Sequence, residues 1–208
     1  MTLIKERPIL FAAPMVRAIL EGRKTVTRRE VKKQAALDCL AAGFEPAFLA
    51  LPGNSDLCPQ GRPGDRLWVR ETTEMDEQTS DSVALTRYAV DGEPVLYSGC
   101  ADPEYNGTVA HWDYPRRSRP SIHMHRWASR IVLEITDVRV ERLQAISRSD
   151  IRAEGLECPP ELASDDVSPN YRDWYPAAWR DLWESINGAG AWEANPWVWV
   201  VEFKRVMP

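Results

Sequence analysis

The sequence predicts an α+β fold of about six strands, with short helices near the start and the end of the chain. Two segments, 128–142 and 197–206, are rich in the β-branched and aromatic residues that favour strands. Apolar residues recur at helical spacing in short segments near both ends of the chain. Turn residues separate many short elements, and strands of this number and spacing could close as a small barrel.

In the first third of the chain, strands and short helices alternate. Pro14 is a good first helical residue, and Met15, Val16, Ile19 and Leu20 form one apolar helix face that Gly22 ends. Pro8 fits the start of a strand, where a missing N–H is tolerated. The expected elements are a strand at 7–11, a helix from Pro14, a strand at 25–31, a short helix at 34–42 and a strand at 66–72.

In the remaining chain, one strand dominates the prediction. Both faces of 128–142 are largely apolar, which indicates a central strand or a barrel wall. Residues 73–82 are polar and acidic and predict a loop, and 91–127 predicts a long stretch with little regular structure. The other expected elements are a strand at 85–90, a short helix from Ser147 to Gly155, a loop at 159–171, a helix at 176–186 and a strand at 197–206.

Length and composition predict a single domain over residues 1–208. No apolar run is long enough for a membrane span, and the residues after Met1 do not form a secretory signal, so we expect a cytoplasmic protein. The net charge of −5 argues against a DNA-coating protein. Nevertheless 21 of the 26 basic residues are arginine, the side chain suited to bidentate recognition of phosphate or carboxylate.

The cysteine and histidine spacings predict neither a disulfide framework nor a metal centre. Cys39, Cys58, Cys100 and Cys158 contain no Cys-x-x-Cys pair and are expected to be free thiols. His123 and His125 could share one face of a strand and hold a metal, but the spacing offers no third ligand. We therefore expect two histidines on a basic loop and no metal or other cofactor.

Two features of the sequence can carry chemistry. Residues 22–29, Gly-Arg-Lys-Thr-Val-Thr-Arg-Arg, place four cations and two hydroxyls at a junction between helix and strand. They can be a charge cap followed by an exposed edge strand, or a ligand site. Glu134 lies on a largely apolar strand face, where a carboxyl group is either paired with a cation or has a raised pKa that suits a general acid or base. Composition does not separate these alternatives.

Three segments, taken together, resemble the ASCH domain family, whose members are relatives of the PUA RNA-binding domains. They are 22–29, the Pro-Gly-Asp turn within 63–71, and 129–135, and the resemblance extends from about Arg7 to Val206. It is closest to the longer branch associated with phages and prophages. The resemblance implies a PUA-like β-barrel with flanking helices, here with insertions at about 32–60 and 73–127.

Some small ASCH proteins are amidohydrolases that act on N4-acetylcytidine and related N4-acylated cytosine compounds. Matched to this sequence, the resemblance implies that Lys24, Thr27 and Glu134 are catalytic. Thr27 would attack the acyl carbonyl, Lys24 would act as its base if deprotonated, and Glu134 would protonate the leaving amine. Lys24 and Thr27 are three residues apart, so their side chains would point to opposite faces of a regular strand. They converge only if Lys24 lies in the turn before the strand.

The expected ligand is a nucleoside or RNA, and no obligate protein partner is evident. An RNA-binding module without catalysis is the first alternative, because arginines contact phosphates and aromatic rings stack on unpaired bases. Metal-dependent RNA cleavage with His123 and His125 is the second, since the family includes a ribonuclease. Trp179, Trp183, Trp197 and Trp199 are expected in the core. The candidate substrate-binding residues are Arg23, Thr25, Arg28, Trp68, Arg70, Arg126 and Trp127.

Overall fold

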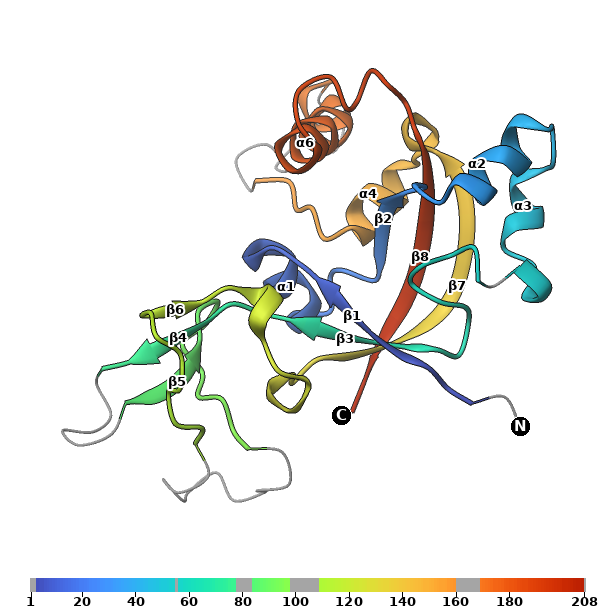
Figure 1. The fold of residues 1–208 in the computed structure, drawn as a ribbon. Coiled ribbons are helices and arrows are strands. Elements are labelled where there is room, and N and C mark those ends of the chain that lie inside the picture. The colour runs from blue at the N-terminus through green and yellow to red at the C-terminus, as the bar shows by residue number, and fades with distance from the viewer. Residues whose placement is uncertain (1–2, 55, 78–83, 98–108, 160–168, 208) are drawn as a thin grey trace.

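The computed structural model describes residues 3–54, 56–77, 84–97, 109–159 and 169–207, which form a mixed α+β fold built on two sheets (Figure 1). The larger sheet has the strand order β1-β3-β7-β8-β2. Its strands are β1 (Glu6–Leu10), β3 (Arg66–Arg70), β7 (Val132–Arg142), β8 (Trp197–Val206) and β2 (Val26–Glu30). The α+β class expected from the sequence is therefore confirmed.

Strand β7 is the centre of the larger sheet, as its two apolar faces predict. It pairs antiparallel with β3 on one side and with β8 on the other, and a register shift between Ile135 and Asp137 marks a bulge. Strands β1 and β3 are parallel, whereas β2 pairs antiparallel with β8, with Thr27 opposite Val201. Strand β2 is thus an edge strand at the far end of the sheet from β1.

Alternate residues of β8 separate two hydrophobic cores, because successive side chains of a strand point to opposite faces. Trp199 and Val201 belong to the larger core, which also holds Phe11. Val198 and Val200 belong to the second core, where α6 contributes Trp179 and Trp183. The prediction of buried tryptophans is confirmed, with Trp197 partly buried against the larger core.

The helices flank the larger sheet, and their bounds follow the expected signals at most ends. They are α1 (Ala13–Leu20), α2 (Gln34–Ala41), α3 (Pro46–Leu49), α4 (Arg148–Ala153) and α6 (Pro169–Asn187). Helix α6 begins well before the expected Pro176, which lies inside it. The expected loop at 159–171 is therefore helical from residue 169, and its residues 160–168 lie outside the described part.

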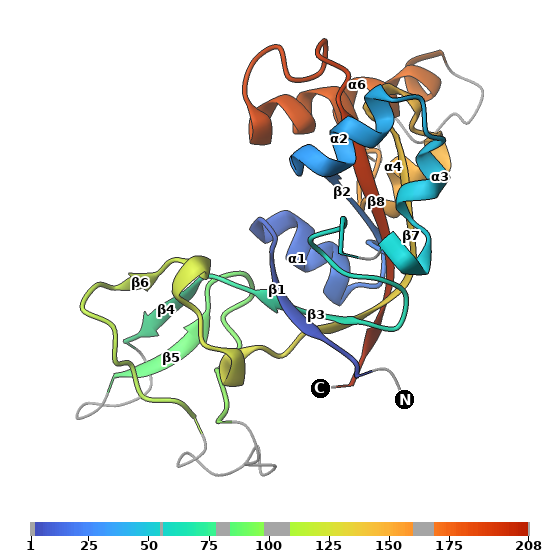
Figure 2. The same cartoon turned by 45° about the vertical axis from the view of Figure 1, so that its right-hand side comes forward.

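The smaller sheet has the order β5-β4-β6 and projects away from α6 in both views (Figures 1 and 2). Its strands are β4 (Thr73–Asp76), β5 (Leu85–Tyr88) and β6 (Ser118–Arg119). The expected loop at 73–82 was wrong for its first residues, because β4 pairs with strands on both sides. The expected barrel of about six strands is not confirmed: the described strands form two sheets of five and three, and no closed barrel is found among them.

Two further findings concern the described residues. Cys39, Cys58 and Cys158 are free thiols, whereas Cys100 lies outside the described part. In the helices that are described, no segment is long and apolar enough to cross a membrane.

Candidate active site at the edge strand

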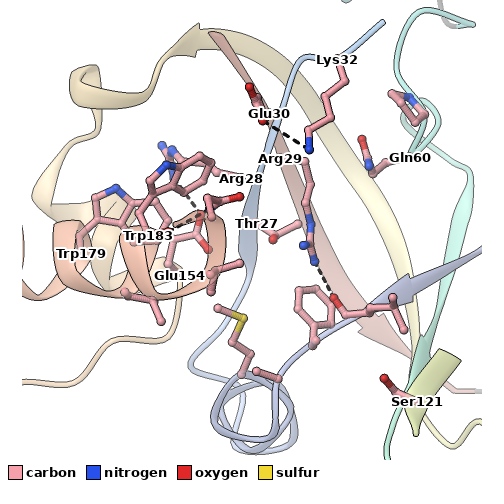
Figure 3. A pocket seen from close by; sticks show the side chains of 18 residues that line it. Thr27, Arg28, Arg29, Glu30, Lys32, Gln60, Ser121, Glu154, Trp179 and Trp183 are labelled. Atoms are coloured by element: carbon pink, nitrogen blue, oxygen red, sulfur yellow. Dashed lines mark hydrogen bonds and ion pairs between the residues drawn. The ribbon is translucent and has the colours of Figure 1, made fainter. Parts of the chain in front are cut away.

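A pocket of about 580 Å³ lies along β2, between the start of α1 and helix α6 (Figure 3). Strand β2 contributes Thr27, Arg28 and Arg29, which lie within the cationic segment singled out in the sequence. Both apolar and polar side chains line the pocket. The apolar ones include Phe11, Met15, Trp179, Leu182, Trp183 and Ile186.

The turn before β2 directs Lys24 into the protein. Helix α1 ends where Gly22 adopts a positive φ of 76°, a conformation that glycine adopts without steric cost. The backbone N–H groups of Arg23 and Lys24 then both donate to the carbonyl of Ala18, at 2.8 and 3.0 Å. Because β2 begins only at Val26, Lys24 lies in the turn before the strand. This is the position in which the side chains of Lys24 and Thr27 were expected to be able to converge.

Lys24 is buried, and three acceptors surround its ammonium group. Nζ donates to the Glu154 carboxylate at 2.6 Å, to the Val26 carbonyl at 2.7 Å and to the Glu154 carbonyl at 3.0 Å. Its side chain is 0 % exposed and that of Glu154 is 2 % exposed. Burial lowers the pKa of Lys24, and the attraction of Glu154 opposes this only in part. The neutral amine is therefore easier to reach than in an exposed lysine.

Glu154 follows the last residue of α4 and also lines the pocket. Ser147 caps the start of this six-residue helix by accepting from the backbone N–H of Asp150 at 3.1 Å. Gly155, which comes next, has a φ of 93°, and a Cβ there would lie 2.7 Å from the Cβ of Ala18 and 3.1 Å from that of Lys24. The close approach at Gly155 therefore brings Glu154 against Lys24.

Arg28 points to the opposite face of β2 from Thr27 and binds three carboxylates. Its fully buried side chain pairs with Asp150 and Glu141 at 2.5 Å and with the second oxygen of Glu154 at 3.3 Å. Arg139 also binds Asp150, at 2.6 Å. Glu154 is thus held between Lys24 and Arg28, while Asp150 fixes α4 against the sheet.

Thr27 and Arg29 share the other face of β2, towards Phe11. Thr27 is buried and lines the pocket, and Figure 3 shows it between Glu154 and Arg29. Lys24 stands behind this site, with Nζ 5.5 Å from the centroid of the Phe11 ring. Thr27 and Glu154 thus line the same pocket, and Glu154 binds the buried Lys24.

Glu134 is not among the residues that line this pocket, and its expected catalytic role with Lys24 and Thr27 stays a prediction. Its carboxylate pairs with Lys204 of β8 at 2.9 Å, and both side chains are partly exposed. Val138, not Glu134, lies level with Thr27 across β8. Glu134 lies four residues farther along β7, which is about 13 Å. The carboxylate that binds Lys24 beside the pocket is that of Glu154.

Arg28 is the one candidate substrate-binding residue that lines the pocket. Arg23 instead binds the carboxylate of Glu21 and, at 2.7 Å, the carbonyl of Gly155. Thr25 is exposed, and its backbone bonds Ala153 and Phe203. Both residues therefore secure the turn around Lys24 and lie outside the pocket lining.

The other four candidates lie together on a second surface. The Trp68 ring is buried, with the guanidinium of Arg70 4.7 Å and that of Arg126 5.9 Å from its centroid. Arg126 and Trp127 line a separate pocket of about 520 Å³. The half-exposed Trp127 ring stacks on Tyr97, with centroids 5.0 Å apart.

Sequence reasoning missed Glu154 and the functional position of the α6 tryptophans. Glu154 precedes the glycine that was expected to end a short helix, but nothing in the sequence indicated that this turn lies against Lys24. The expectation of a metal-free protein remains a prediction. Within the described ranges, no group of three or more His, Cys, Asp or Glu side chains is placed to hold a metal. His123 lies beside Tyr114, and His125 stacks on Trp127.

No family model matches the chain, and no curated protein matches it. Among solved structures, the chain is similar to an ASCH domain from Lactobacillus crispatus JV V101, with 11 % identity and a TM-score of 0.37 over 98 % of this chain and 81 % of that one. It is also similar to a DUF984 protein from Enterococcus faecalis V583, with 11 % identity and a TM-score of 0.39 over 100 % and 79 % of the two chains. Likenesses this loose carry no information about a reaction.

Proposed function

We propose that the pocket at β2 is the active site of an amidohydrolase, which removes the acyl group from N4-acetylcytidine or a related N4-acylated cytosine nucleoside. The observation that carries the proposal is the arrangement of three groups. Thr27 and Glu154 line one pocket, and Glu154 binds the buried Lys24 at 2.6 Å. These groups supply a nucleophile and a proton acceptor, and the substrate class comes from the resemblance of residues 22–29 to the ASCH family.

In the proposed reaction, the active form of the Lys24–Glu154 pair holds a neutral amine and a carboxylate. Thr27 Oγ1 bonds to the acyl carbon while its proton passes through Glu154 to the Lys24 amine. The carbon–nitrogen bond then breaks, and the same proton goes to the amino nitrogen of cytosine as it leaves. Water next attacks the Thr27 ester, which releases the carboxylic acid and restores the hydroxyl group.

The walls of the pocket suit a planar heterocycle. Trp179 and Trp183 lie with ring centroids 5.9 Å apart on one side, and Phe11 lies on the other. Aromatic rings of this kind bind a flat base through stacking and exclude water from the reacting amide. A cavity of about 580 Å³ falls within the usual size range of small-molecule sites.

The test is the release of cytidine from N4-acetylcytidine, followed by chromatography. We expect Thr27→Ala to lose about 10²–10⁴-fold in kcat, the usual range for loss of a principal catalytic group. Thr136→Ala is a matched control, because Thr136 is an exposed threonine on β7 and does not line the pocket. Equal rates for the two variants, or no turnover by the wild type across a series of N4-acyl cytidines, would exclude the proposal.

A second candidate function, RNA binding without catalysis, is favoured by the aromatic surface around Trp127. The rings of Tyr97, Trp127 and His125 stack in sequence, and Trp127 and Tyr97 are 37 % and 40 % exposed. Exposed rings beside arginines bind unpaired bases. Filter binding of single-stranded RNA at several salt concentrations tests this function. Trp127→Ala should weaken binding, whereas Leu51→Ala, which removes an even more exposed apolar side chain elsewhere, should not.

A further inference from the structure

Arg29 brings a positive charge into the pocket without a carboxylate to balance it. Its neighbour Arg28 pairs with three carboxylates, but no ion pair joins Arg29 to any acidic side chain among the described residues. Arg29 donates from Nη2 to the Leu10 carbonyl at 2.6 Å, and its guanidinium carbon lies 5.4 Å from the Phe11 ring centroid. A guanidinium carries five N–H donors, so one carbonyl leaves most of them available.

The surroundings of Arg29 make this charge costly. Burial lowers the pKa of Arg29, and the more distant carboxylate of Glu154 offsets that effect only in part. Arginine nevertheless keeps its proton in proteins. A negative charge that forms in the pocket would therefore be stabilised, because the half-buried cation is already held in place by the Leu10 carbonyl and the Phe11 ring.

Arg29 lies next to the atom that performs the proposed attack. Thr27 and Arg29 are two residues apart on β2, so their side chains leave the same face at roughly 7 Å spacing. Both line the pocket, and Figure 3 shows the Arg29 guanidinium on the same side of β2 as Thr27. The Leu10 carbonyl and the Phe11 ring fix the guanidinium in this position.

We infer that Arg29 is a further catalytic residue, which stabilises the oxyanion formed when Thr27 attacks the acyl carbonyl. The inference rests on the proposed function. As the Thr27 oxygen bonds to the carbonyl carbon, the π electron pair moves to the carbonyl oxygen, and the free N–H groups of Arg29 donate to it. When the carbon–nitrogen bond breaks, the pair returns to re-form the carbonyl, and the hydrogen bonds to Arg29 weaken.

A purely structural role for Arg29 predicts different results. In that case the guanidinium would only tie β2 to the end of β1 through Leu10, and its loss would lower stability and leave kcat of the folded protein unchanged. Arg142 makes the same two kinds of contact, with the Asn195 carbonyl at 3.0 Å and with the Trp197 ring at 4.2 Å, and it does not line the pocket. Arg142→Gln is therefore a matched control.

The first experiment compares the kinetics of Arg29→Gln, Arg29→Lys and Arg142→Gln on N4-acetylcytidine. Loss of one oxyanion donor typically costs about 10²–10³-fold in kcat. We expect this loss in Arg29→Gln with KM within about threefold of wild type, partial recovery in Arg29→Lys, and wild-type kinetics in Arg142→Gln. Thermal melting shows whether each variant is folded. A raised KM at unchanged kcat would overturn the inference and leave the proposed function standing.

The second experiment measures binding by calorimetry and needs no turnover. The probes are the methylphosphonamidate of cytidine, whose anionic tetrahedral phosphorus replaces the acetyl carbon, and the neutral N4-ethylcytidine. We expect Arg29→Gln to weaken the anionic probe about 100-fold and the neutral probe less than threefold. Equal losses for both probes, or equal affinity of wild type and variant for the phosphonamidate, would overturn the inference. Absence of wild-type turnover would instead count against the proposed function.

Discussion

Two lysine–glutamate pairs, one between the turn before β2 and the end of α4 and one across β7 and β8, differ almost entirely in their surroundings. Lys24 and Glu154 are 0 % and 2 % exposed and lie 2.6 Å apart beside a pocket. Lys204 and Glu134 are 60 % and 32 % exposed and lie 2.9 Å apart. The residue types and the distances are alike. Only the first pair is removed from water, and burial lowers the pKa of its lysine, Lys24.

This difference decides what each pair can do. Water screens an exposed pair and solvates both of its charges, so protonation of either partner changes little. A buried pair has no such solvent, and the loss of one charge leaves the other uncompensated. Burial therefore makes the Lys24 ammonium easier to deprotonate, whereas the Lys204–Glu134 pair joins β8 to β7 at the surface.

The largest expected effect comes from breaking the buried pair. Glu154→Gln leaves Lys24 and Arg28 without a carboxylate that binds both, which should lower the free energy of unfolding by about 3–5 kcal/mol. The same change should reduce kcat for the proposed reaction by about 10²–10⁴-fold. Denaturant unfolding and initial rates measure the two effects.

Glu134→Gln is the matched substitution in the exposed pair. We expect it to change the free energy of unfolding by less than about 1 kcal/mol and to leave kcat unchanged. If Glu134→Gln abolished turnover and Glu154→Gln did not, the exposed pair would be the functional one and the proposed site would be wrong.

The next effect is the pH dependence of the proposed reaction. The pair must lose one proton to act as a base, and burial lowers the pKa of Lys24 below its ordinary value of 10.5. We expect kcat to rise about tenfold per pH unit below that lowered pKa and to level off above it. The folded state binds fewer protons than the unfolded state between the lowered pKa and 10.5, so stability should also rise with pH across this window.

A pH–rate profile from pH 5 to 10 checks this prediction. Lys24→Arg provides the comparison, because arginine keeps a positive charge and does not deprotonate in this range. A wild-type profile that is flat, or that falls as the pH rises through this range, would contradict the assignment of Lys24 as part of the base.

Sequence reasoning singled out Lys24 and Thr27 but not Glu154, the carboxylate that binds Lys24. The glycine at 22 and the start of a strand near Val26 are local signals, and they place Lys24 in a turn correctly. Glu154 reaches Lys24 across 130 residues, through the docking of α4 on the turn, and no local pattern encodes that contact. Glu134 attracted attention because it interrupts an apolar strand face, yet Lys204 opposite it on β8 satisfies its charge.

In the fold as well, elements that depend on local sequence patterns could be predicted, and pairings between distant segments could not. Strands β7 and β8 are long and strongly patterned, so their existence and the central position of β7 could be predicted. Strand β4 is short and polar, and one of its two partners, β6, is distant in sequence. Barrel closure likewise depends on whether edge strands meet, which periodicity does not reveal; here β1 and β2 lie at opposite ends of the sheet.

Asp65 offers an intermediate case, a buried carboxylate without a catalytic role. Burial raises the pKa of Asp65, but the backbone N–H of Lys5 and the side chain of Arg7 outweigh it, so the pKa lies below 3.8. Asp65→Asn should therefore lower the free energy of unfolding by about 1.5–3 kcal/mol at pH 7. The difference in the free energy of unfolding between the variant and the wild type should be largest above pH 3.8. It should vanish as the pH falls through the lowered pKa of Asp65. Denaturant unfolding at several pH values measures it, and a constant difference would contradict the assignment.

The smallest effect is expected at Lys204, and it completes the comparison of the two pairs. Lys204→Met removes a cation that is 60 % exposed, so Glu134 regains water rather than remaining buried and unpaired. We expect a change of less than about 1 kcal/mol in the free energy of unfolding, which shrinks further in 0.5 M salt because the pair is screened. Lys24→Met should show a loss several times larger that salt barely alters. Similar losses and similar salt dependence in the two variants would mean that burial does not distinguish the pairs.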